Sequence, residues 1–117
     1  MEKFDKTLNT IVKTLVEGKC VVRAPIFLAN GGWLSVQASE FHDCHPREVL
    51  DASKYDSYEV MGRDVKMPES FAHYFCGEFY SKVPRKDLLD FIEDCGGIVD
   101  TPQDRNYFMV KLNKEVE

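Results

Sequence analysis

The feature that most constrains this fold is the turn signal ANGG at residues 29–32, which lies between two strand-forming segments. Residues 20–28 are rich in β-formers, and residues 33–38 place an apolar side chain at every second position, at Leu34, Val36 and Ala38. Asn and Gly tolerate the positive φ that tight hairpin turns require. The sequence therefore predicts an antiparallel hairpin, with an edge strand or a bulge at Pro25.

Two helices are predicted from apolar periodicity. The first has one apolar face and ends before Gly18; this face consists of Phe4, Leu8, Ile11, Val12, Leu15 and Val16. Pro84 opens the second helix, a position where a missing N–H costs nothing. Its apolar face consists of Leu88, Phe91, Ile92 and Cys95, and Gly96 and Gly97 end it.

The remaining segments complete one domain, 1–117. We expect a loop over 39–56 with a short helical turn near 46–52, a strand at 58–61 and a short helix at 70–76. Further strands are expected at 78–83 and 107–112, and residues 112–117 are expected to fray. Because strand–helix units are few, the order favours an α+β two-layer sandwich. It would have a mainly antiparallel sheet of about four to five strands and two main helices.

Charge and composition exclude several classes of protein. The net charge is −5, from 20 acidic and 15 basic residues, which disfavours direct binding to nucleic acid. No signal peptide and no membrane-length apolar run is seen, so a cytoplasmic protein is expected. The cysteines at 20, 44, 76 and 95 form no C-x-x-C pair and are expected to be free thiols. No nucleotide or dinucleotide motif is present, so no cofactor is expected.

The stretch FHDCHPRE at residues 41–48 carries the densest set of reactive side chains. One hypothesis is a zinc site, with alternative ligands His42, Cys44, His73 and Cys76. Another is a thiol enzyme in which His42 or His45 activates Cys44. The competing interpretation is a polar loop with exposed histidines and a packed Cys76.

A ligand-binding module is a further alternative for the same region. Trp33, His42, His45 and Arg47 could line a pocket for an anionic, nucleotide-like molecule. Arg47 would supply paired hydrogen bonds, and Trp33 a stacking surface.

An acidic stripe marks the second predicted helix. Asp87, Asp90 and Asp94 lie at i, i+3 and i+7, and Glu93 is close by. Such a face could contact an arginine-rich partner, with Trp33 at the hairpin as an aromatic anchor. A solvated face of this kind is what most amphipathic helices show, and the binding interpretation stays open beside it.

Part of the sequence resembles small, largely uncharacterised proteins of bacteriophages and mobile elements. The similar segments are a strand LSVQAS (34–39), a loop FHDCHPR (41–47), a strand YEV (58–60) and a late segment over 80–97. The N-terminal part, with EGK at 17–19 and Val22-Arg23, resembles a phage family that sequesters nucleotide signals in Thoeris immunity. The tryptophan-rich motif of that family is absent.

The resemblance implies a small, cofactor-free protein that acts by binding. It would inhibit a host defence protein, such as a nucleic-acid-binding CRISPR effector, by covering a basic channel with acidic side chains. We therefore predict a non-enzymatic inhibitor or interaction protein. We expect it to be a monomer, or a homodimer formed through the edge strand that contains Pro25.

Overall fold

The computed structural model describes residues 2–99 of the 117-residue chain. The α-helices are α1 (Glu2–Leu8) and α2 (Arg85–Asp94). The strands are β1 (Ile11–Leu15), β2 (Cys20–Arg23), β3 (Ile26–Phe27), β4 (Trp33–Gln37), β5 (Ser57–Arg63) and β6 (Tyr80–Pro84). Short 3₁₀ segments are η1 (Val16–Gly18), η2 (Ala52–Lys54) and η3 (Glu69–Tyr74).

The main sheet is antiparallel, with the strand order β3-β4-β5-β6. The predicted hairpin is confirmed, because β3 pairs with β4 across the ANGG turn. In that turn the Asn30 side chain accepts a hydrogen bond from the Gly32 N–H (3.0 Å), and Gly31 has a φ of 95°. This positive φ is the reason for glycine at position 31.

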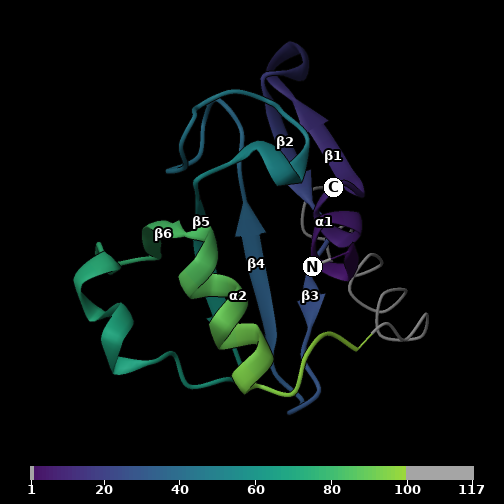
Figure 1. The fold of residues 1–117 in the computed structure, drawn as a ribbon. Coiled ribbons are helices and arrows are strands. Elements are labelled where there is room, and N and C mark those ends of the chain that lie inside the picture. Colours follow the sequence, from purple (N-terminus) through teal and green to yellow (C-terminus); the bar gives the residue numbers. More distant parts are fainter. Residues whose placement is uncertain (1, 100–117) are drawn as a thin grey trace.

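Helices α1 and α2 contribute to one core on one face of this sheet. Figure 1 shows α2 passing in front of the sheet, while the β1–β2 hairpin extends beyond it. The fully buried core side chains include Phe4 and Leu8 of α1, Leu34 and Val36 of β4, Tyr58 and Val60 of β5, and Leu88 of α2. The α+β class predicted from the sequence is confirmed.

The predicted N-terminal helix over residues 4–16 is wrong in its second half. Helix α1 ends at Leu8, and the next segment is strand β1, paired with β2. The segment TIVKTLV at residues 10–16 is rich in β-branched residues, which lose side-chain freedom in a helix and pack well in a strand. The apolar residues placed on the helical face are not buried here, since Ile11, Leu15 and Val16 are exposed.

Pro25 separates two strands where the sequence predicted one. The first part, β2, pairs with β1, and the second part, β3, pairs with β4 at the edge of the main sheet. Proline has no N–H for a ladder hydrogen bond, so the chain changes partner sheets at this position.

The predicted turn near 46–52 occurs later, as η2, and the predicted helix at 70–76 is the 3₁₀ segment η3. The predicted strand 107–112 and tail 112–117 lie outside the described residues.

A buried arginine joins these elements. Arg23, at the end of β2, is 2% exposed. Its guanidinium donates hydrogen bonds to the carbonyls of Ala38 (3.0 Å), Leu8 (2.9 Å) and Leu50 (2.9 Å) and to the Tyr55 hydroxyl (3.2 Å). Neutral oxygens therefore replace the water that the cation loses on burial. The side chain ties the base of the β1–β2 hairpin to the ends of α1 and β4.

Candidate functional site

The outer side of α2 carries a concentrated set of acidic side chains. Pro84 precedes this helix with an extended φ of −60° and ψ of 143°. Leu88, Phe91 and Ile92 are buried against the sheet, so the opposite side of the helix faces solvent. That side carries the four acidic residues predicted from the sequence: Asp87 is half-buried, and Asp90, Glu93 and Asp94 are exposed.

Two of the four carboxylates have partners that set their roles. Asp87 accepts a hydrogen bond from the Tyr74 hydroxyl (2.7 Å), and this bond raises the pKa of Tyr74. Asp90 accepts one from the exposed Lys86 ammonium (2.8 Å) at i,i+4 spacing. Asp87 thus joins α2 to η3 and is structural in part. Glu93 and Asp94 are exposed, and Asp90 is exposed together with its ion-pair partner Lys86.

Two hollows flank the acidic side of α2, the surface that carries Asp87, Asp90, Glu93 and Asp94; the first has a mainly apolar lining and the second a mixed one. Between α1 and α2 a groove of about 520 Å³ is lined by Phe4, Leu89 and Ile92, among others. On the other side a smaller hollow of about 250 Å³ is lined by Phe71 and Phe91 together with Pro68, Ser70 and three of the aspartates. Asp90 lines both hollows. The acidic face is therefore grooved, and apolar surface lies beside its charges.

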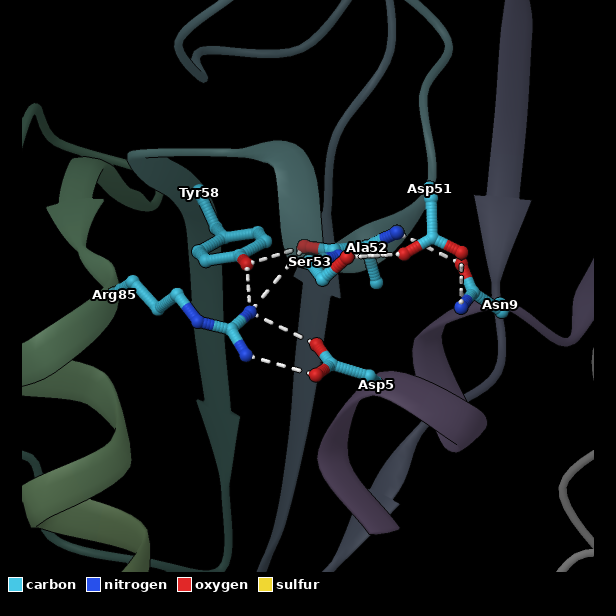
Figure 2. A network of polar contacts seen from close by, with 7 residues as sticks. All are labelled: Asp5, Asn9, Asp51, Ala52, Ser53, Tyr58 and Arg85. Atoms are coloured by element: carbon cyan, nitrogen blue, oxygen red, sulfur yellow. Dashed lines mark hydrogen bonds and ion pairs between the residues drawn. The ribbon is translucent and has the colours of Figure 1, made fainter. Parts of the chain in front are cut away.

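A polar network fixes α2 against α1 (Figure 2). The Arg85 guanidinium donates to both carboxylate oxygens of Asp5, each at 2.8 Å, with the two side chains 21% and 23% exposed. It also donates to the Tyr58 hydroxyl (2.7 Å), which in turn donates to the Ala52 carbonyl (2.7 Å). Its carbon Cζ lies 5.3 Å from the centre of the Phe4 ring. Asp5 and the Tyr58 hydroxyl raise the pKa of Arg85, which stays charged.

The network continues from the end of α1 to η2, as Figure 2 also shows. The Asn9 side chain accepts from the Ala52 N–H (2.8 Å) and donates to Asp51 (2.9 Å). Asp51 also accepts from the Ser53 hydroxyl and N–H, and these hydrogen bonds lower the pKa of Asp51. The relative position of α1, α2 and η2 is thus set by charged and amide contacts as well as by the core.

Trp33 does not join the acidic face. It is half-buried in β4, opposite Phe27 of β3 and Arg63 of β5. Directly paired residues share a sheet face, and Leu34 next to Trp33 points into the core, so Trp33 lies on the face turned away from the helices. The sequence-predicted combination of Trp33 with the α2 aspartates is therefore not brought together on one surface.

The loop FHDCHPRE is held by its own hydrogen bonds. The Ser39 hydroxyl bonds to the His42 Nδ1 (2.7 Å), and Arg47 Nε donates to the His42 carbonyl (2.9 Å). Burial, helped by the charges of Arg23 and Arg47, lowers the pKa of His42. His45 is exposed and bonds to Asp56 (2.9 Å).

The predicted ligand pocket is only partly assembled. His42 and Arg47 are neighbours, but Trp33 begins β4 and His42 follows the end of that strand. The strand itself is roughly 15 Å long. Arg47 is engaged by Asp43 (3.0 Å). One pocket containing Trp33, His42, His45 and Arg47 is thus not formed by the described residues.

Cys44 is placed as a packed thiol. It is 1% exposed, and its Sγ lies within hydrogen-bond distance of the carbonyls of Ser39 (3.3 Å) and Pro46 (3.4 Å), the two acceptors for its single S–H. Burial raises the pKa of Cys44, whereas a nucleophilic or metal-binding cysteine needs a lowered one. Cys76 is exposed and bonds to the Phe79 carbonyl (3.2 Å).

The alternative zinc ligands do not converge. His73 lies against the Tyr74 ring, 3.9 Å between ring centres, whereas Cys44 is enclosed in its own loop. Among residues 2–99, no three His, Cys, Asp or Glu side chains gather closely enough to hold a metal ion.

Contacts of Asp43, within this loop, with Glu59 of β5 and Ser81 of β6 were not anticipated from the sequence. Asp43 accepts from the Ser81 hydroxyl (3.1 Å), and its N–H donates to Glu59 (3.1 Å). Burial raises the pKa of Glu59, and the charge of Asp43 adds to this effect. Asp43 thus joins the loop to β5 and β6. These contacts have no sequence signal, because Asp43, Glu59 and Ser81 lie in separate elements.

Comparison with known proteins identifies no relative. No protein-family model, no curated protein and no solved structure matches the chain. The resemblance to phage proteins accordingly stays a prediction. Within the described part of the chain, the helices are too short or too polar to span a bilayer.

Proposed function

We propose that the chain is a non-enzymatic interaction protein that binds a basic surface of another protein through the outer side of α2. The observation that supports this most directly is the set of carboxylates on one side of a single helix, namely Asp87, Asp90, Glu93 and Asp94. One cation, Lys86, stands among them, so this side of the helix keeps a net negative charge. Such a surface attracts a basic partner and fixes its orientation.

The class of partner that fits is a nucleic-acid-binding protein, since its channel must be basic to hold phosphates. The resemblance of the sequence to phage proteins favours a defence effector of the host within this class. An acidic helix would then occupy the channel in place of the nucleic acid. The overall charge of −5 supports the same encounter at longer range.

Charge reversal tests the proposal. The variant Asp90→Lys, Glu93→Lys, Asp94→Lys keeps Asp87, because Asp87 is needed by Tyr74. Lysines in the last turn of a helix are favoured by its dipole, so the fold should tolerate positions 93 and 94. The control is Glu40→Lys, Glu48→Lys, Glu78→Lys, which makes the same change of net charge at exposed positions outside α2.

Affinity capture from bacterial lysate, quantified by mass spectrometry, compares the three proteins. We expect a basic partner retained by the wild type and the control and lost by the α2 variant, with binding that weakens as salt is raised. Equal retention by the α2 variant would show that the stripe is only solvated.

A further inference from the structure

The groove between α1 and α2 is the larger of the two hollows described beside the acidic side of α2. Its walls come from both helices and from the segment that follows α2, with apolar side chains from Phe4, Leu89, Ile92 and Ile98. Its volume of about 520 Å³ falls in the range of sites that bind small ligands and side chains, roughly 300–1,000 Å³. Leu89 and Ile98 are half-buried, so this apolar lining is accessible.

The rim of the groove is charged and mainly acidic. Helix α1 contributes Glu2 and Lys3 to it, and α2 contributes Asp90 and Glu93. An apolar floor with three carboxylates and one ammonium around it is complementary to a segment that carries apolar and basic side chains together. A purely anionic or purely apolar occupant would bring no cation to these carboxylates.

We propose that this groove binds the apolar anchor side chains of a basic peptide segment of the partner, with Asp90 and Glu93 pairing to Lys or Arg on either side of the anchor. This inference rests on the proposed function and adds to it the chemistry of the bound segment. Recognition of an amphipathic helix by a groove between two helices follows the same physics.

The groove is formed before a partner binds. Arg85 begins α2 and holds Asp5 of α1 through two hydrogen bonds of 2.8 Å, so the two walls are fixed relative to each other. A preformed site loses less conformational freedom on binding. The Asp5–Arg85 pair thus has a positioning role for the groove.

Selection from a displayed library of short random peptides tests the proposal without knowledge of the partner. Wild-type protein is the bait, and each selected peptide is then measured against Leu89→Gln and against Asp90→Asn, Glu93→Gln. Circular dichroism and thermal unfolding verify that each variant is folded. The matched control is Leu50→Gln, a half-buried leucine in the 39–56 loop.

We expect selected peptides to combine Lys or Arg with a Leu, Ile, Met or Phe anchor. Leu89→Gln should weaken them about tenfold, in the range of an interface anchor, and the control should not. Basic peptides without an anchor, lost only in the charge variant, would overturn the groove and leave the acidic-surface function standing. If the selected peptides are insensitive to both variants, or if no peptide is selected, the groove proposal and the proposed function are both overturned.

The oligomeric state is measured on the same samples by light scattering. A monomer is expected at the assay concentration for the wild type and for Leu89→Gln. A wild-type dimer that Leu89→Gln dissociates would assign the groove to a second copy of this chain and overturn the proposal.

Discussion

Replacing Arg85 by Met should destabilise the fold and loosen α1 from α2. Arg85 makes two charged hydrogen bonds to Asp5 and one to the Tyr58 hydroxyl, and about one fifth of its side chain is exposed. Hydrogen bonds to charged groups contribute roughly 1.5–3 kcal/mol, but partial exposure to water screens this pair. Methionine keeps most of the length of the side chain and removes the guanidinium, with its hydrogen bonds and its contact with the Phe4 ring. We therefore expect a loss of about 2–3 kcal/mol in the free energy of unfolding.

A double-mutant cycle in urea isolates the contact. Asp5→Asn, Arg85→Met and the double variant are compared, and a coupling free energy of about 1–2 kcal/mol is expected. Lys86→Met is the matched control one residue along; its exposed ion pair with Asp90 should have no measurable effect. A coupling near zero, or an equal effect of Lys86→Met, would refute the reasoning that the Asp5–Arg85 pair holds the two helices.

Three further predictions concern the 39–56 loop and its neighbours. Glu59→Gln should raise thermal stability at neutral pH and lose this advantage near pH 4, because burial raises the pKa of Glu59 and its ionised form is disfavoured in the fold. The lowered pKa of His42 means that the unfolded chain takes up a proton first as the pH falls below 6.5. The wild type should therefore lose stability there, and His42→Asn should flatten this slope in urea titrations. Mass spectrometry after brief alkylation should find Cys76 modified and Cys44 unmodified until the protein is unfolded.

Local patterns were sufficient to predict the β3–β4 hairpin and α2. The turn residues at 29–32 and the alternation in β4 specify the hairpin, and Pro84 with the following periodicity specifies the helix. The segment 11–16 shows the limit of periodicity, since its apolar spacing fits a helix and its β-branched composition fits a strand. In the fold the strand forms, as pairing with β2 satisfies its backbone.

The candidate site was predictable in its charges and not in its shape. The α2 stripe followed from helical spacing, but the grooves beside it depend on α1, η3 and the segment after α2. Arg23 and Arg85 find their partners at sequence distances that no local pattern can show, 80 residues in the case of Asp5. The reactive side chains of FHDCHPRE suggested chemistry, whereas most of them hold the loop together.

The most direct test of the central claim is hydrogen–deuterium exchange of the captured complex compared with the free protein. Binding through the acidic face predicts slower exchange in α2 (85–94) and in α1, with unchanged exchange in the β1–β2 hairpin, whose Leu15 and Val16 are also exposed. Protection confined to that hairpin or to the 39–56 loop, with α2 unchanged, would contradict the account.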